Sequence, residues 1–314
     1  MATLYITHDR FIDHDTGPGH PERPDRMRSV HKALAADAFD ALDRRQAPWR
    51  DDVEAAITAA HPKSYVDDLK ARAPSPGGDL VRLDPDTVMS PGTWEAAMRA
   101  VSGGLDAVDA VMGGDVANAF CAVRPCGHHA ERTTAMGFCL FNNVAIAGMY
   151  ARARHGAERV AVIDFDVHHG NGTQDIYERE PALFFASTHQ MPLYPGTGAL
   201  SETGVGNICN APLRPGDGKE PFQDAFESRV LPALRHFGPD LILISAGFDA
   251  HRDDPLANLQ LTEADFVWAT GKIAEVADKH CEGRLVSMLE GGYDLAALER
   301  SVAAHVGMLM QAGA

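Results

Sequence analysis

Three ionisable side chains, Asp164, Asp166 and His168, stand at alternate positions directly after the apolar residues 160–163. Successive side chains of a strand point to opposite faces, so these three are predicted to share one face. Burying such a set is costly unless a cation compensates, and carboxylate oxygen together with imidazole nitrogen suits zinc. Asp249 follows another apolar run and would supply a third ligand beside Asp166 and His168. Three protein ligands and one open position predict a catalytic zinc, because structural zinc sites are closed by four ligands.

The same pattern has a purely structural interpretation. One aspartate would cap a helix and the histidine would pack in the core, which is the better account of a lone Asp-x-His. The presence of Asp164, and of Asp249 at a matching strand end, favours the metal instead.

Two further motifs could complete a hydrolytic site. His128 and His129 stand together just after another predicted strand, and an imidazole beside a metal can take a proton from a water molecule that the metal acidifies. Gly291 and Gly292 end the last predicted strand with a turn that would aim Tyr293 into a cleft, where the phenol could donate a hydrogen bond to an oxyanion. Taken alone, surface histidines and a core tyrosine explain these motifs as well.

A larger framework must hold these motifs. Short apolar runs alternate with helical patterns, which predicts one α/β domain with a mainly parallel sheet. The predicted strands cover residues 4–7, 117–123, 160–165, 183–187, 241–245 and 285–289. The predicted helices cover residues 22–36, 62–72, 94–112, 142–155, 222–236, 262–280 and 295–311. Polar loops follow most of the strands, and ligands of open α/β sheets bind at the carboxyl ends of the strands, so one composite site is expected there.

Composition narrows the class of protein. The 314 residues are 45% hydrophobic and 23% charged, and 28 basic against 44 acidic residues give a net charge of −16. So acidic a chain is not expected to bind nucleic acid or an anionic membrane through phosphate contacts. Five cysteines without a C-x-x-C pair, and an N-terminus without signal-peptide character, predict a cytoplasmic protein without disulfides. Helix faces alone leave a homo-oligomer open.

The motifs, taken in order, also match a known family. They read RPCGHH at 124–129, GFCLFNN at 137–143, DFDVHHGNG at 164–172, YPGTG at 194–198, SAGFD at 245–249 and EGGY at 290–293. This set resembles the zinc-dependent histone deacetylase family, most closely class II members and their bacterial relatives, the histone deacetylase-like and acetylpolyamine amidohydrolases. The resemblance runs from about His20 to Tyr293. It implies a single deacetylase domain over residues 1–314, with an arginase–deacetylase α/β fold whose mainly parallel sheet has about eight strands flanked by helices.

The resemblance implies roles for individual residues. Asp166, His168 and Asp249 would bind Zn²⁺, one ion per chain, and His129 would be the general base with His128 as its electrostatic partner. Other catalytic and positioning roles fall to Tyr293, which would polarise the acyl carbonyl, to Asp164, which would orient His128, and to Arg26, near the inner end of the substrate tunnel. The residues implied to bind substrate in that tunnel are Gly137, Phe138, Tyr194 and Leu256.

The family also binds K⁺ near its zinc. By position, one potassium ion would be surrounded, partly through backbone oxygen, by Asp164, Asp166, His168, Ser187 and Thr188. A weaker match to a second potassium site lies around Tyr177, Glu180, Leu183 and Asn207.

Two positions bear on mechanism and specificity. Asn171 stands where class I members carry an aspartate, which is the class II pattern and should leave His129 a readier base. Leu256 follows Asp254-Pro255, where acetylpolyamine-specific class IIb relatives carry a glutamate. The predicted reaction is therefore hydrolysis of an acylated amine, with an acetyl-lysine type favoured, to acetate and free amine. Which loop narrows the tunnel mouth would help to decide the substrate, and residues 11–19 are the first candidate.

Three alternatives remain. An acetylpolyamine or other small acylated amine could be the substrate. An arginase-like enzyme with two manganese ions would want a carboxylate two residues beyond His168, where Gly170 stands. A non-catalytic regulatory protein with a deacetylase fold would be expected to lose a ligand, a histidine or Tyr293, and none is lost.

Overall fold

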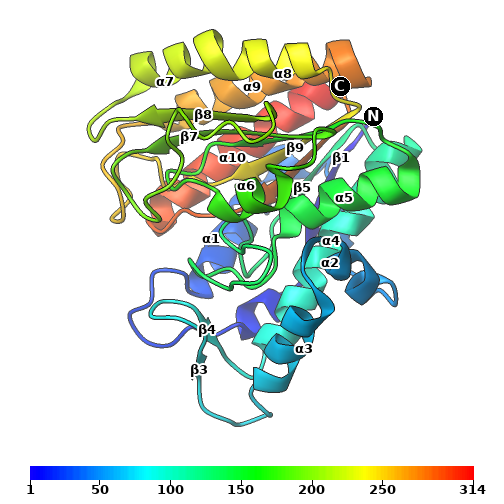
Figure 1. Cartoon of the computed structure of the whole chain (residues 1–314), viewed down its shortest axis with the longest axis vertical. Coiled ribbons are helices and arrows are strands. Elements are labelled where there is room, and N and C mark those ends of the chain that lie inside the picture. The colour runs from blue at the N-terminus through cyan, green and yellow to red at the C-terminus, as the bar shows by residue number, and fades with distance from the viewer.

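The computed structural model describes residues 1–314. Its centre is an eight-stranded sheet in the order β2-β1-β5-β10-β9-β6-β7-β8, and every neighbouring pair is parallel (Figure 1). The strands are β1 (Thr3–Thr7), β2 (Asp43–Gln46), β5 (Asn118–Cys121), β6 (Val160–Asp164), β7 (Leu183–Gln190), β8 (Ile208–Leu213), β9 (Leu241–Ala246) and β10 (Leu285–Leu289). All carboxyl ends therefore lie at one edge, and the predicted α/β sheet of about eight strands is confirmed.

Helices cover both faces of the sheet. Figure 1 shows α8, α9 and α10 on one side and α4 and α5 on the other. The helices are α1 (Asp25–Leu34), α2 (Val53–Ala60), α3 (Lys63–Arg72), α4 (Thr93–Gly113), α5 (Asn143–His155), α6 (Asn171–Tyr177), α7 (Lys219–Ala225), α8 (Leu231–Phe237), α9 (Glu263–Cys281) and α10 (Leu295–Gly313). Short 3₁₀ segments are η1 (Asp9–Asp13) and η2 (Asp37–Phe39). No helix is both long enough and apolar enough to cross a membrane.

The strands form because both of their faces are covered. Every residue of β5, β6, β9 and β10 is buried, which explains why these strands are nearly continuous apolar runs. One cluster of 88 buried apolar residues runs from Leu4 to Leu309, so the two helical layers and the sheet share a single core.

Several elements differ from the sequence prediction, which also lacked α2, α6 and the short strands β3 (Val81–Arg82) and β4 (Val88–Met89). The edge strands β2 and β8 were not predicted, because β2 reads Asp-Arg-Arg-Gln and β8 contains Asn210 and Pro212. The single helix predicted over 222–236 is interrupted by a π-helical turn, η3 (Phe226–Val230), between α7 and α8. There the rings of Phe222 and Phe226 both pack on Trp268 of α9.

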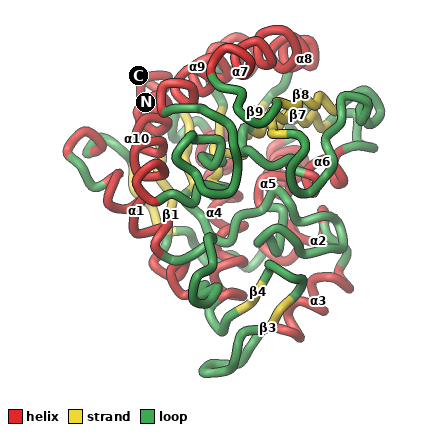
Figure 2. Tube along the Cα trace, turned by 90° about the vertical axis from the view of Figure 1, so that its left-hand side faces the viewer, coloured by secondary structure: helices red, strands yellow, loops and turns green.

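Loops after the strands build the surface at the carboxyl edge. Figure 2 looks onto these loops, with a small antiparallel hairpin, β3 and β4, projecting from the rest of the chain. The loops after β5, β6, β9 and β10 carry the motifs singled out in the sequence. Because β5, β10, β9 and β6 are consecutive neighbours in the sheet, their loops meet.

Candidate active site

A buried trio of possible metal ligands lies where β6 and β9 end. Asp166, His168 and Asp249 each place one ligand atom within 4.8 Å of the others. The Nδ1 atom of His168 lies 3.1 Å from Asp166 Oδ1 and 3.1 Å from Asp249 Oδ2. Gly291 lies so close to the Asp249 and Asp166 carboxylates that a Cβ there would collide with both. The sequence prediction that these three residues converge matches this geometry.

Contrary to the sequence prediction, Asp164, Asp166 and His168 do not lie along one strand. Strand β6 ends at Asp164, so the two later residues lie in the loop that follows. Each carboxylate there accepts the backbone N–H two residues ahead: Asp164 Oδ1 from Asp166 at 3.0 Å, and Asp166 Oδ1 from His168 at 2.9 Å. Successive turns of this kind, rather than a continuing strand, aim the side chains.

The tandem histidines have different partners. His128 Nδ1 lies 2.9 Å from Asp164 Oδ2, whereas His129 Nδ1 lies 2.7 Å from Asn171 Oδ1. Asn171 donates its amide N–H to Glu131 Oε1 at 2.8 Å, so its oxygen must face His129. An amide oxygen can only accept, and His129 therefore carries its proton on Nδ1 and leaves Nε2 as a free acceptor.

The pKa values of the two histidines are also shifted in opposite directions. Burial opposes charge on His128, but the Asp166 and Asp164 carboxylates outweigh it and raise the pKa of His128 well above its usual value. Burial lowers the pKa of His129 well below its usual value, and the neighbouring His128 and His168 lower it further. His128 is thus held as a cation, and His129 as a neutral base.

A pocket of about 220 Å³ opens onto these groups. Its lining residues are Asp86, His129, Gly137, Phe138, His168, Leu193, Tyr194, Leu256 and Tyr293. All four residues predicted to bind substrate are in this set. The predicted mouth loop, residues 11–19, is not, and Asp86 and Leu193 were not predicted. Asp86 lies between β3 and β4, a segment without any local motif.

The pocket wall includes a strained turn at Gly137 and Phe138. Gly137 has φ +55°, and a Cβ there would lie 2.5 Å from the His129 ring, so only glycine lets that ring pack against the turn. Phe138 itself has φ +69°, which is unusual for a residue with a side chain. Its N–H donates to Thr87 Oγ1 at 3.0 Å, which helps to hold it there.

Tyr293 closes the opposite wall. Its ring packs edge-on against Phe138, with 5.9 Å between centroids, and the Arg26 guanidinium lies 5.1 Å from its centroid on the inner side. Arg26 is fully buried and donates to the carbonyl oxygens of Gly292 and Glu290 and to the Glu22 carboxylate. Arg26 does not itself line the pocket, and its predicted place near the inner end of the substrate tunnel stays a prediction.

Sequence analysis missed the role of the Glu290 side chain. Glu290 is only 1% exposed, and its Oε2 accepts the N–H groups of Gly127 at 2.7 Å and His128 at 3.1 Å. Burial raises the pKa of Glu290 to about 7 against the opposing influence of His128. The thiols of Cys126 and Cys139, 3.4 Å apart, lie beside this carboxylate. Only the fold brings the loops after β5 and β10 together.

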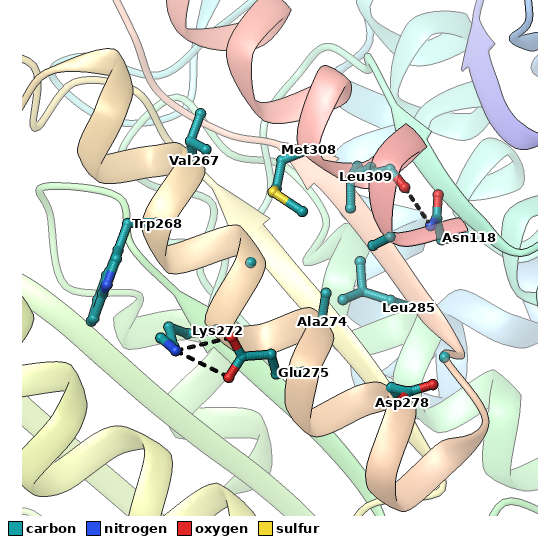
Figure 3. Close-up of a pocket in the computed structure, with 13 residues that line it drawn as sticks. Asn118, Val267, Trp268, Lys272, Ala274, Glu275, Asp278, Leu285, Met308 and Leu309 are labelled. Carbon is teal, nitrogen blue, oxygen red and sulfur yellow. Dashed lines mark hydrogen bonds and ion pairs between the residues drawn. The ribbon is translucent and has the colours of Figure 1, made fainter. Parts of the chain in front are cut away.

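A larger hollow of about 610 Å³ lies between α9 and α10 (Figure 3). Trp268 and Met308 form part of its apolar wall, and Lys272 Nζ is paired with Glu275 Oε1 at 2.9 Å on its rim. The first residues of β5 and β10 line it, so it lies at the amino edge of the sheet. None of its lining residues is a histidine, cysteine, serine or tyrosine, and its two acids, Glu275 and Asp278, are exposed.

Comparisons with known proteins agree with the site. The family model described as the histone deacetylase domain matches residues 20–309. A histone deacetylase-like amidohydrolase of Pseudomonas aeruginosa is 41% identical over 90% of this chain and 75% of its own. A chloroplastic histone deacetylase 10 of Oryza sativa subsp. japonica is 40% identical, over 90% of this chain and 68% of its own.

A solved structure gives the same result. The crystal structure of the HDA15 HD domain superposes with a TM-score of 0.91 at 34% identity, and the match covers 99% of this chain and 90% of that one. Fold, family model and relatives thus agree over nearly the whole length. The chain belongs to the histone deacetylase family of hydrolases.

Proposed function

We propose that the protein is a zinc-dependent amidohydrolase that cleaves an acylated amine, with an acetyl-lysine type of substrate favoured, to acetate and free amine. We propose also that residues 1–314 form one deacetylase domain. The observation that carries the proposal is the convergence of three buried possible ligands, one neutral imidazole and one phenol on a single pocket.

The donor set fits a divalent cation. Asp166, His168 and Asp249 offer two carboxylates and one imidazole, all buried. Three ligands of this kind with an open side suit a catalytic zinc. A zinc ion held there would polarise the acyl carbonyl and acidify a water molecule.

His129 would act as the general base. Its Nε2 is the free acceptor on the pocket wall, because Nδ1 is bound by Asn171. It takes one proton from the attacking water and returns a proton to the leaving nitrogen, so that the amide bond breaks to an acid and an amine. His128, held as a cation by Asp164, keeps His129 neutral before the reaction.

Tyr293 would stabilise the oxyanion that forms on the acyl carbon. Its ring faces Phe138 across the pocket, and a phenol there can donate a hydrogen bond to the carbonyl oxygen as charge develops. Phe138, Tyr194 and Leu256 would enclose the aliphatic stem of the substrate, which is what an apolar wall favours.

One observation favours the second candidate substrate, an acetylated polyamine. The carboxylate residue Asp86 lines the same pocket, and it could pair with an ammonium group further along a polyamine. Leu256 argues for an uncharged stem instead, since it occupies the position of the polyamine-selective glutamate. We favour acetyl-lysine because five apolar or aromatic side chains line the pocket against one acid.

We further propose a potassium site beside the zinc. Asp164 and Ser187 are register partners on β6 and β7, which brings the predicted ligands Asp164, Asp166, His168, Ser187 and Thr188 to adjacent strand ends. The Thr188 hydroxyl is buried without a hydrogen-bond partner, as expected of a site that a cation completes. At the weaker second match, Asn207 Nδ2 already donates to the carbonyls of Tyr177, Glu180 and Leu183.

A substrate panel tests the proposal. Acetyl-lysine peptides, acetylated polyamines and small acylated amines are compared, with and without a hydroxamate inhibitor, while metal content is measured by mass spectrometry. We expect one zinc per chain, and hydrolysis that chelation abolishes and zinc restores. Two manganese ions per chain would point to a ureohydrolase. Bound zinc without turnover of any acylated amine would favour a non-catalytic protein.

A further inference from the structure

A buried carboxylate in the loop after β9 joins two walls of the pocket. Asp254 is only 6% exposed, and its Oδ2 accepts the N–H groups of Tyr293 at 2.7 Å and Asp294 at 3.2 Å. Its other oxygen, Oδ1, accepts the N–H of Leu256 at 3.1 Å. Three main-chain donors therefore converge on one side chain, and no basic side chain forms an ion pair with it.

Such an arrangement is not needed for packing alone. A buried carboxylate is costly to desolvate, and only charge-assisted hydrogen bonds of good geometry offset that cost. The three residues whose N–H groups bind Asp254 lie at important places. Leu256 and Tyr293 both line the pocket, and the Asp294 side chain caps α10 by accepting the Ala297 N–H. The carboxylate thus ties the start of α10 and two pocket residues to the loop that follows the ligand Asp249.

We infer that Asp254 is a positioning residue, which holds the backbone of Tyr293 so that its hydroxyl meets the acyl oxygen, and which sets Leu256 against the substrate stem. This inference rests on the proposed function. It goes further in naming a residue that acts on the reaction through Tyr293 rather than by touching the substrate. Misplacing a catalytic group by about 1 Å can lower the rate by roughly 100-fold, so the tether matters to turnover.

The contacts also show why an amide could not replace the carboxylate. Both oxygens of Asp254 accept hydrogen bonds, one from Leu256 and the other from Tyr293 and Asp294. An asparagine would have to turn its NH₂ toward one of these N–H groups, where two donors face each other. Asp254→Asn thus breaks the tether at one end, at almost constant volume.

A double-mutant cycle on acetyl-lysine peptide hydrolysis tests the inference. Asp254→Asn is measured alone and in combination with Tyr293→Phe, and metal content and melting temperature are measured for each protein. We expect Asp254→Asn to lower kcat by about 10- to 100-fold with zinc retained, because the phenol is misplaced. In the Tyr293→Phe background the same change should lower kcat less than about 3-fold, because the group it positions is already gone.

The matched control is Asp253→Asn. Asp253 is the adjacent aspartate, but its side chain is 48% exposed and pairs with Arg300 at 3.0 Å. We expect kcat of this variant to stay within about twofold of the unmodified protein, as for most surface substitutions. A loss equal to that of Asp254→Asn would show that any change in this loop suffices, and would overturn the inference.

Other outcomes are equally decisive. Equal effects of Asp254→Asn with and without the Tyr293 hydroxyl would overturn the inference, as would a single variant with normal kcat. If the asparagine variant does not fold, the smaller Asp254→Ser replaces it in the cycle, and loss of folding in both would assign Asp254 to stability alone. Hydrogen exchange of the Tyr293 backbone amide reports on its hydrogen bond to Asp254 independently of turnover, and we expect this exchange to be faster in Asp254→Asn. Absence of turnover in the unmodified protein would instead contradict the proposed function.

Discussion

The pocket at the carboxyl edge of the sheet and the groove between α9 and α10 differ in an instructive way. The groove is the larger hollow, about 610 Å³ against about 220 Å³, yet it has no histidine, cysteine or tyrosine in its lining, and its two acids, Glu275 and Asp278, are exposed. The smaller pocket contains two histidines, an aspartate and two tyrosines. The volume of a hollow therefore shows only where packing is incomplete. The side chains that could take part in a reaction gather where loops follow parallel strands.

The buried histidines near the two hollows also differ in their hydrogen-bond partners. Near the groove, His305 is fully buried among phenylalanine rings and is satisfied by the Thr270 and Ser287 hydroxyls, at 2.7 and 2.8 Å. At the pocket, His128 and His129 are coupled to carboxylates, to an amide and to each other. We therefore expect changes at the pocket to alter turnover, and changes around the groove to alter stability.

The largest effect is expected from His129→Ala. Removal of the base should lower kcat by roughly 1000-fold, within the range of general-base contributions. Zinc content should not change, because His129 is outside the predicted ligand trio. Steady-state kinetics and metal analysis check this, with Lys272→Ala at the groove as the control expected to keep full activity. Parallel loss of zinc and activity would show that His129 is a ligand instead.

The next-largest effect on kcat is expected from Tyr293→Phe. Removing one oxyanion donor is expected to lower kcat by about 100-fold or more and to leave KM and folding nearly unchanged. The control is Tyr150→Phe, since the Tyr150 hydroxyl binds Asp109 far from the pocket. Near-normal turnover of Tyr293→Phe would remove this residue from the mechanism, and with it much of the contrast with the groove.

Leu309→Ala tests the groove, where we expect a change in stability rather than in turnover. Leu309 is fully buried behind the groove, and its truncation should lower the free energy of unfolding by roughly 2–3 kcal/mol. We place the effect at the low end because the open groove lets neighbours relax. Urea denaturation measures the loss, with exposed Gln311→Ala as control, and kcat at 25 °C should be unchanged. A matching fall in kcat would show that the groove communicates with the site.

The last prediction concerns the pH dependence of stability, where the effect is smallest when it is taken per pH unit. Burial lowers the pKa of His305 to about 3, from an ordinary value of 6.5. Between these values the unfolded chain binds a proton that the folded chain does not, so the free energy of unfolding falls as pH falls. His305 alone contributes about 1.4 kcal/mol per pH unit well inside this window, and nothing above it. His305→Gln, which cannot titrate, should show a correspondingly flatter dependence of stability on pH, and equal slopes would contradict the assignment.

The sequence predicts well whatever is local or periodic. The buried strands are readable because both faces are apolar, and the convergence of Asp166, His168 and Asp249 follows from strands whose carboxyl ends share one edge. The edge strands β2 and β8 were missed because β2 is polar and only half-buried, and because Asn210 and Pro212 interrupt the apolar residues of β8. The β-strand propensities of their residues therefore do not indicate a strand at either place.

The missed site residues share a different cause. Asp254 and the Glu290 carboxylate act on groups far away in the sequence, as Glu290 does on Gly127 and His128, and Asp86 reaches the pocket from a distant hairpin. An acid that accepts distant backbone N–H groups looks in the sequence like any surface acid. Only the three-dimensional structure, with its burial and its donors, tells them apart.

The position of β10 has a consequence for folding. β10 is the last strand in sequence, yet it lies in the middle of the sheet between β5 and β9, and Tyr293 follows it directly. On the ribosome, all other strands emerge before it, and none of them can close the gap between β5 and β9. Such long-range pairing slows folding. A nascent chain that ends before β10 therefore lacks the strand between β5 and β9 and the segment that carries Tyr293.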